Sequence, residues 1–199
     1  LCAENEKWPE QSQKSEEDIN KFLAPHGSKA KILPIQSVGV QGDSRTYRNP
    51  VAVWGEAYDF NSLEKISTSL TNRFFTINRV CLLLNPLEIK SIRILPSCLN
   101  GKRIKLLQEL DDIVMKFIKR HGIERDIWQF PTVLLPIMIN GIKRESVVLR
   151  PVCSEEAMTA NFYKMNAGLL KKLANKLKPK VSAVFYDITN KPPGTIEWE

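Results

Sequence analysis

The feature that most constrains the fold is an internal repeat. Three apolar segments in the first half of the chain return in the second half, in the same order and about one hundred residues later. The three pairs are residues 32–35 (ILPI) and 134–137 (LLPI), residues 51–55 (VAVWG) and 147–151 (VVLRP), and residues 78–84 (NRVCLLL) and 182–188 (SAVFYDI). Self-similarity at a fixed spacing predicts that one structural unit is used twice.

Each copy carries one amphipathic helix between its second and third apolar segments. We expect Asn61 or Ser62 to cap the first helix, and Asn166 precedes the second. The apolar positions at helical spacing are Leu63, Ile66, Leu70 and Phe74 in the first copy and Leu169, Leu170, Leu173 and Leu177 in the second. The order strand, strand, helix, strand predicts two ββαβ repeats, each a small sheet covered by a helix.

A third helix separates the two copies. Residues 102–122 place apolar side chains on one side and end at Gly122, a typical helix stop. We expect His121 to complement the dipole of this helix rather than to act in catalysis. The fold class is therefore α/β of the α+β type, with two ββαβ repeats joined by a long helix.

The expected domain boundaries follow from these elements. They are 1–31 for an N-terminal leader from the end of a preceding domain, 32–100 for the first repeat, 101–128 for the linker helix and 129–199 for the second repeat with its C-terminal tail. In the leader, Ser15 and Asp18 resemble a capping box before a short helix whose packing partners could lie outside the chain. The chain starts with Leu1 instead of Met, so we expect it to be part of a longer protein.

The two copies differ at the turn between their first two strands. In the second copy, Asn140 and Gly141 predict a type I′ hairpin turn, because both residues accept positive φ. In the first copy, residues 38–50 predict a longer loop. Within it, Asp43 can accept hydrogen bonds from hydroxyl or ring N–H groups, and Arg45 offers a planar fork suited to phosphate. A plain surface turn is an equal alternative.

The C-terminal tail is stiff and charged. Lys191 directly follows an apolar strand, and two prolines then restrict the backbone before the chain ends in TIEWE. Stiffness lowers the entropy lost on ordering, which suits a tail that must hold Lys191 and Glu197 at fixed positions. The alternative is that the apolar tail residues fill a hydrophobic gap while the acids stay in water.

Composition and charge limit the function classes. The longest apolar run, residues 133–139, is too short to span a membrane. The four cysteines are scattered without a C-x-x-C pair, which argues against a zinc site or a disulfide framework and favours a reducing, cytoplasmic setting. The net charge is +7, and residues 164–180 hold six lysines and no acid. These lysines could form a nucleic-acid-binding face, but a solvated helix face is favoured because no aromatic or Arg side chain interleaves with them.

Two stretches resemble a known family. GVQGDSRTY (residues 39–47) and YDITNKPPGTIEWE (residues 186–199) closely resemble the C-terminal dimerisation domain of GMP synthase, and residues 147–162 (VVLRPVCSEEAMTANF) extend the match. The resemblance covers roughly residues 32–199. About one hundred residues separate the two halves of the match, which looks like the doubled domain of longer, eukaryotic-type enzymes. Asn190 stands where the family often has Ser.

The resemblance implies a binding site for xanthosine monophosphate (XMP). The implied substrate ligands are Asp43, Arg45, Gln129, Lys191 and Glu197. Lys191 would contact the phosphate, and Glu197 the ribose hydroxyls or a base N–H group. Arg150 would face a dimer interface. The resemblance implies neither a catalytic residue nor a metal ligand in this chain.

The resemblance also implies a role within a larger enzyme. GMP synthase uses ATP with Mg²⁺ and glutamine to aminate XMP to GMP, and its glutaminase and ATP-pyrophosphatase sites are absent from this sequence. We therefore expect a substrate-binding, self-associating domain that needs no cofactor of its own, is inactive alone, and has those two domains as partners. Monomer and homodimer both stay open. A basic nucleic-acid or protein interaction module and a purely structural dimer domain are the alternatives.

Overall fold

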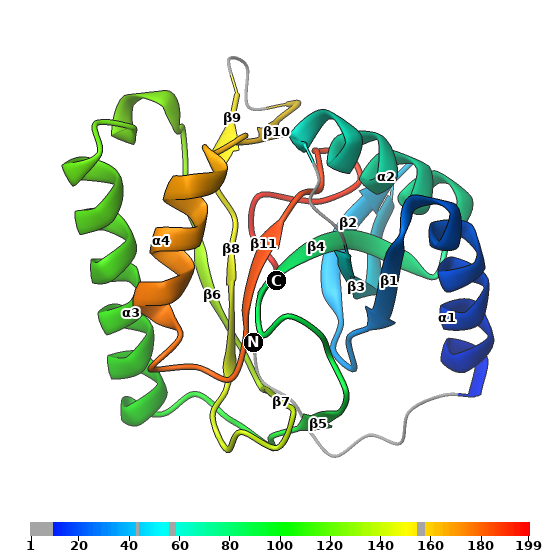
Figure 1. Ribbon diagram of the computed structural model, residues 1–199, viewed down its shortest axis with the longest axis horizontal. Helices are drawn as coiled ribbons and strands as arrows, with labels where there is room; N and C mark the ends of the chain where they lie inside the picture. Colours follow the sequence, from blue (N-terminus) through cyan, green and yellow to red (C-terminus); the bar gives the residue numbers. More distant parts are fainter. Residues whose placement is uncertain (1–9, 43, 56–58, 155–157) are drawn as a thin grey trace.

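The computed structural model describes residues 10–42, 44–55, 59–154 and 158–199 (Figure 1). Its α-helices are α1 (Glu10–Leu23), α2 (Phe60–Arg73), α3 (Gly101–Arg120) and α4 (Ala167–Leu177). Its strands are β1 (Ser28–Ile32), β2 (Ser37–Gln41), β3 (Ser44–Gly55), β4 (Ile77–Asn85), β5 (Ile92–Ile94), β6 (Thr132–Leu135), β7 (Ile137–Ile139), β8 (Ser146–Leu149), β9 (Val152–Cys153), β10 (Asn161–Phe162) and β11 (Val184–Asp187). Short 3₁₀ turns cover Ala24–His26 and Glu124–Asp126.

Both ββαβ repeats are present, and they share one sheet. Its seven strands run in the order β1-β3-β4-β11-β8-β6, with β2 paired to β3. In the first repeat β1 is antiparallel to β3, and β3 is parallel to β4 across helix α2. The second repeat mirrors this order with β6, β8 and β11 across helix α4. The last strands of the two repeats, β4 and β11, pair antiparallel and join the expected two small sheets into one.

The strand register confirms the repeat at the level of single residues. Ile32 pairs with Val51 in the first repeat, and their sequence counterparts, Leu134 and Val147, pair in the second. Val51 is also the parallel partner of Val80, as Val147 is of Val184. Equivalent residues therefore occupy equivalent positions on either side of the β4–β11 junction.

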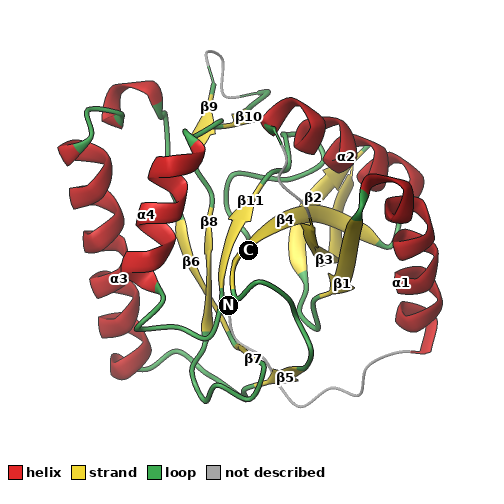
Figure 2. Ribbon diagram, viewed as in Figure 1, coloured by secondary structure: helices red, strands yellow, loops and turns green. Residues whose placement is uncertain are grey.

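The sheet separates two hydrophobic cores. All four α-helices bury apolar residues in the larger core on one face, and Figure 2 shows α3 and α4 beside β6 and β8, and α1 and α2 beside β1 and β3. The smaller core, on the other face, contains residues from β4, β7, β8 and β11 together with Trp198 of the tail. The C-terminal tail therefore covers the face that the helices leave open.

The helix starts differ in part from the sequence expectations. Asn166 caps α4 as expected, but the cap of α2 is Asp59, whose carboxylate accepts hydrogen bonds from two backbone N–H groups of the first turn. Helix α1 begins at Glu10, so Ser15 lies inside this helix and does not cap it. Two α1 residues, Ile19 and Leu23, are fully buried in the larger core, so this helix has its packing partners within the chain.

The two predicted turns have different outcomes. Asn140 and Gly141 both have positive φ, 52° and 75°, as a type I′ turn requires. The strand before this turn, β7, pairs with β5 instead of β8. In the first repeat, the expected long loop is wrong: residues 37–55 form the β2–β3 hairpin, whose strands pair up to Gln41 and Ser44.

Candidate functional site

The C-terminal tail is bound to both repeats by backbone hydrogen bonds. On one side, Val40 N–H of β2 donates to Pro193 O at 2.7 Å, and Val38 N–H donates to Trp198 O at 3.0 Å. On the other side, Lys191 and Ala160 exchange backbone hydrogen bonds of 2.7 and 3.2 Å. The tail thus links the hairpin of the first repeat to strand β10 of the second.

A charged cluster buried under the tail fixes its path. The Asp187 carboxylate, at the end of β11, receives Arg79 Nη1 at 2.9 Å and lies 3.2 Å from Arg150 Nη1. The side chains of all three residues are fully buried. Trp198 Nε1 donates to the same carboxylate at 3.0 Å. One carboxylate thus connects the two repeats and the tail.

The two arginines also donate to the tail itself. Arg79 Nη2 donates to Thr195 Oγ1 at 2.7 Å and to Glu197 O, and it reaches Val38 O of β2 at 3.0 Å. Arg150 donates to Thr189 O and, at 3.0 Å, to Thr195 O. Arg150 therefore lies in the interior of the domain and does not face an interface, contrary to the expectation from the sequence.

The cluster carries more positive than negative charge. Two guanidinium groups share one carboxylate, and the buried Nε atoms of both arginines lack hydrogen-bond partners. Burial lowers the pKa of Arg79 to about 10, and the nearby Asp187 charge opposes this shift. Carbonyl oxygens of the tail therefore supply much of the compensation that this excess charge needs.

Gly39 allows the tail to approach β2 closely. It forms a β-bridge with Gly194 of the tail. A Cβ atom at Gly39 would lie 2.8 Å from Pro193 O and 2.8 Å from Asn78 Nδ2, closer than side chains tolerate. The group that approaches the backbone most closely at Gly39 is therefore the tail.

The predicted ligand Arg45 lies near the tail. Arg45 of β3 pairs with Val40, which in turn donates to Pro193 O. Adjacent strands lie about 4.8 Å apart, so the Cα atom of Arg45 is about 10 Å from the tail backbone at Pro193. Its side chain is exposed. Asp43, the other ligand predicted in this hairpin, lies outside the described residues.

Gln129 and Lys191 lie on the same face of a small ribbon. Gln129 pairs with Val152 of β9, and Val152 pairs with Phe162 of β10. Residues paired directly across strands share a face, as do residues two apart in one strand, so Ala160 lies on this face too. Ala160 is the partner of Lys191. The ribbon therefore brings the exposed Gln129 and the half-buried Lys191 to one side.

Glu197 is exposed and lines a separate hollow of about 420 Å³ between α3 and β6. The other lining side chains include Leu99, Arg103 and Thr132, and Arg103 forms an ion pair of 2.8 Å with Glu145. Of the four predicted ligands that the structure describes, only Glu197 borders this hollow. Of the two predicted ligands in the tail, Lys191 thus lies beside the β9–β10 ribbon, whereas Glu197 lies beside α3 and β6.

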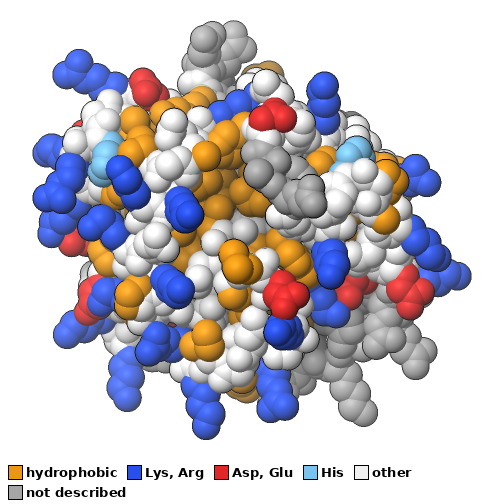
Figure 3. Space-filling model, in the orientation of Figure 1, with side chains coloured by type: hydrophobic (Ala, Val, Ile, Leu, Met, Phe, Trp, Pro, Cys, Tyr) orange, Lys and Arg blue, Asp and Glu red, His pale blue; other side chains and the backbone are white. Residues whose placement is uncertain are grey.

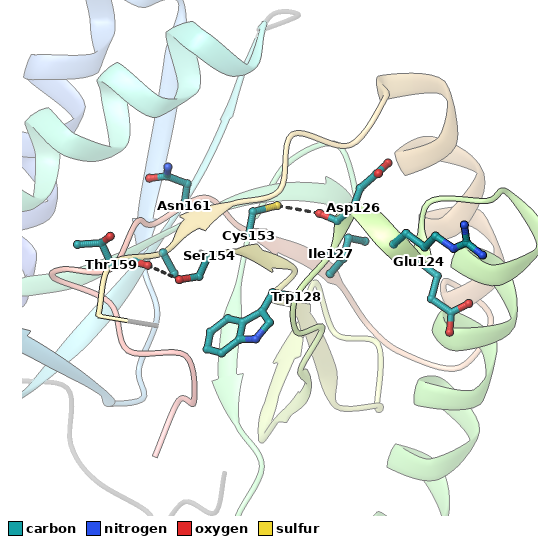
Figure 4. A pocket seen from close by; sticks show the side chains of 10 residues that line it. Glu124, Asp126, Ile127, Trp128, Cys153, Ser154, Thr159 and Asn161 are labelled. Carbon is teal, nitrogen blue, oxygen red and sulfur yellow. Dashed lines mark hydrogen bonds between the residues drawn. The ribbon is translucent and has the colours of Figure 1, made fainter. Parts of the chain in front are cut away.

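Figure 4 shows a further hollow of about 720 Å³, beside the β9–β10 ribbon. Trp128, Cys153 and Asn161 line it, together with the charged 3₁₀ turn Glu124–Asp126. The Cys153 thiol donates to Asp126 O at 3.1 Å, and burial, with a smaller effect of Asp126, raises the pKa of this thiol. A raised pKa disfavours the nucleophilic thiolate. Arg45, Gln129, Lys191 and Glu197, the predicted ligands within the described residues, do not line this hollow.

Sequence reasoning missed two of the residues that organise the site, Arg79 and Asp187. Both lie within otherwise apolar strands, NRVCLLL and AVFYD, where a charged residue must be paired if it is buried. This pattern was the available signal. It would have indicated that each of these strands needs an oppositely charged partner.

The fold and the tail together define an α+β domain of two fused repeats, locked by its own C-terminal residues. Residues 116–198 match the family model of the GMP synthase C terminal domain. None of the described helices is long and apolar enough to cross a membrane.

Curated relatives extend the similarity beyond the second repeat. A probable GMP synthase (glutamine-hydrolyzing) of Leptospira interrogans is 44% identical over 193 residues, which cover 94% of this chain and 32% of that protein. GMP synthases (glutamine-hydrolyzing) of Symbiobacterium thermophilum and Prochlorococcus marinus are 40% and 42% identical, over 49% and 55% of this chain and 21% and 22% of theirs. The chain thus spans about a third or less of the length of these relatives. The Leptospira match extends over both repeats of this chain.

Proposed function

We propose that this chain is the XMP-binding part of a GMP synthase, the ligase that makes GMP in purine biosynthesis. The observation that carries the proposal is the double anchoring of the tail: Val40 holds Pro193, and Ala160 holds Lys191. This arrangement brings the Arg45 hairpin, the Gln129 ribbon and the tail into one region. Cationic, amide and carboxylate groups from separate segments suit a nucleotide with phosphate, ribose and base.

Each ligand has a distinct role in the proposed site. Lys191 and Arg45 bind the phosphate, since both are cationic and Arg offers paired donors. The Gln129 amide can donate to and accept from the base. Glu197 accepts from ribose hydroxyls or a base N–H group, and Asp43 adds a second acceptor. The domain itself acts by positioning XMP for chemistry carried out elsewhere in the enzyme.

The longer enzyme supplies the reaction. Its glutaminase domain releases ammonia from glutamine, and its ATP-pyrophosphatase domain binds ATP and Mg²⁺ in the activation of XMP. This chain contributes no catalytic group to either step. We place the enzyme in the cytoplasm because the spacing of the four cysteines in this chain does not suggest a disulfide framework.

The test compares Lys191→Ala with Lys180→Ala in the full-length enzyme. Lys180 lies on the surface and pairs with Glu109 at 2.8 Å, away from the tail. Loss of a charge-assisted hydrogen bond should weaken XMP binding by about 10- to 100-fold in Lys191→Ala, measured by calorimetric titration. Lys180→Ala should bind as the parent does. Equal affinity of both variants and the parent would exclude the assigned role of Lys191.

We also propose, separately from XMP binding, that the domain mediates self-association. The pairing of β4 with β11 relates the two repeats within one chain, and such internal pairing can replace contacts between two single-repeat subunits. Light scattering of the full-length enzyme at several concentrations distinguishes a monomer from a homodimer.

A purely structural role of the domain predicts that XMP binding survives removal of the last ten residues.

A basic surface favours nucleic acid as a second candidate partner. Lys116, Lys119, Arg120 and Lys176 line a hollow of about 480 Å³ between α3 and α4, and Figure 3 shows Lys and Arg side chains on this side of the molecule. Binding through the phosphate backbone weakens steeply with salt and depends little on sequence. A nucleotide pocket instead discriminates XMP from other monophosphates at constant salt.

A further inference from the structure

The buried charged cluster holds the backbone on both sides of the two predicted tail ligands. Before Lys191, Thr189 is fixed by Arg150 through its carbonyl and by Val80 N–H, which donates to its hydroxyl at 2.8 Å. Between Lys191 and Glu197, Thr195 accepts from both arginines. Glu197 O accepts from Arg79, and the next residue is held through its indole by Asp187.

Arg79 is the only member of this cluster that comes from the first repeat. It extends from β4 to the tail and also donates to Val38 O of β2, the strand beside the Arg45 hairpin. One guanidinium group therefore adds side-chain hydrogen bonds to the backbone bonds that set the distance between the tail and the hairpin. The predicted ligands on these two segments depend on that distance.

Stability alone does not account for this cluster. Two arginines and one aspartate are fully buried, with one positive charge in excess. Burial of charge has a large desolvation cost, and well-packed apolar residues often give equal or greater stability. What the cluster provides, and apolar packing does not, is a set of directional bonds to particular carbonyl oxygens of the tail.

We propose that Arg79 is a positioning residue for substrate binding, which holds Thr195 Oγ1 and Glu197 O so that the tail segment carrying Lys191 and Glu197 keeps a fixed position against the first repeat. This inference rests on the proposed function. Arg79 itself does not touch the substrate. Its effect on XMP passes through Glu197 and the tail backbone.

A double-mutant cycle in the full-length enzyme tests this inference. The variants are Arg79→Met, Glu197→Gln and the two combined. Arg79→Met keeps the approximate side-chain volume but removes the hydrogen-bond donors. Arg79→Met should raise the KM for XMP by about 10- to 100-fold, as expected when a binding group is displaced by about 1 Å. The KM for ATP should stay unchanged. The double variant should bind XMP no more weakly than Arg79→Met alone, because displacement already abolishes the Glu197 contribution.

The controls separate positioning from general destabilisation. Leu70→Ala removes buried contacts of α2 in the larger core and leaves the tail bonds intact, so it should lower the unfolding midpoint without changing the KM for XMP. If Arg79→Met does not fold, Thr195→Val removes the hydroxyl that Arg79 binds, and the same cycle is run with it.

The possible results have separate meanings. If Lys191→Ala and Glu197→Gln leave XMP affinity unchanged, the proposed function fails. If they weaken binding while Arg79→Met or Thr195→Val does not, only the positioning role fails. Multiplicative effects of the two substitutions on XMP binding would also overturn the positioning role, because Arg79 would then act independently of Glu197.

Discussion

The indole N–H of Trp198 donates to the Asp187 carboxylate, with 3.0 Å between Nε1 and Oδ2. Both side chains are buried, and the Arg79 guanidinium carbon lies 5.0 Å from the centroid of the indole ring. The last aromatic residue of the chain is therefore held by a charge-assisted hydrogen bond, a cation–π contact and apolar packing. It joins the tail to both repeats.

This relationship predicts the effect of Trp198→Phe. The variant keeps an aromatic ring but leaves the buried Asp187 oxygen without the indole donor. We expect the free energy of unfolding to fall by about 1.5–3 kcal/mol, the usual cost of losing a hydrogen bond to a charged group. Urea unfolding followed by circular dichroism measures it. Trp128→Phe is the matched control, since Trp128 is 44% exposed and should change stability by less than about 0.5 kcal/mol. Equal effects of the two substitutions would contradict the prediction.

The close approach at Gly39 gives a second prediction. Gly39→Ala places a Cβ atom against Pro193 O and Asn78, so either the tail or β2 must shift. We expect a loss of about 1–3 kcal/mol in unfolding free energy from this overpacking, together with weaker XMP binding in the full-length enzyme. Gly101→Ala is the control, because a Cβ there meets no atom within 4 Å. Unchanged stability and affinity in Gly39→Ala would show that the tail can move away without loss.

The sequence predicted the repeat because apolar periodicity is a local property. The pairs Ile32–Val51 and Leu134–Val147 lie in equivalent registers, as the sequence alignment of the two copies requires. The fusion into one sheet was not predicted. It depends on pairing between β4 and β11, which lie about one hundred residues apart, and no local pattern encodes such a contact.

The site was predicted unevenly for a similar reason. The stiffness of the tail follows from its prolines, but the partners that hold it are non-local. Arg79 and Asp187 were overlooked because their surroundings are apolar, and Arg150 was assigned to a dimer interface because the family resemblance implied that place. The β2–β3 hairpin was missed because the glycines and polar residues of its strands are also typical of a loop.

A third prediction concerns Asn140, which combines a positive φ with three side-chain hydrogen bonds. Its Oδ1 accepts from the N–H groups of Lys90 and Ser91, and its Nδ2 donates to Glu88 O. Asn140→Gly keeps the φ of 52° accessible but removes these bonds, so we expect a loss of about 1 kcal/mol at this partly solvated site.

Asn140→Ala separates the two contributions. It removes the same hydrogen bonds and also places an alanine at positive φ, which costs about 1 kcal/mol more. Thermal and urea unfolding should therefore rank the parent above Asn140→Gly and Asn140→Gly above Asn140→Ala. The reverse order of the two variants would show that the backbone conformation of this turn is not limiting.

The last prediction concerns Glu64, which links α2 of the first repeat to the second. Lys164 Nζ donates to this carboxylate at 2.8 Å, and Asn190 Nδ2, next to Lys191, donates at 2.9 Å. Both hydrogen bonds lower the pKa of Glu64 below its usual value of 4.5, and the one from Lys164 has the larger effect. A carboxyl group with a lowered pKa binds fewer protons in the folded state than in the unfolded state. Its contribution to stability is therefore complete above pH 4.5 and is lost as the pH falls through the lower folded pKa.

Glu64→Gln should therefore reduce the free energy of unfolding by about 0.5–1 kcal/mol near neutral pH, a modest value because the pair is partly exposed. The difference from the parent should shrink as the pH falls below the folded pKa, because the parent carboxylate is then protonated too. Urea unfolding at a series of pH values measures this trend. In a Lys164→Ala background the same substitution should lose most of its pH dependence, since the main cause of the shift is gone. A difference that stays constant down to the acid transition would mean that the charge of Glu64 does not stabilise the junction of the repeats.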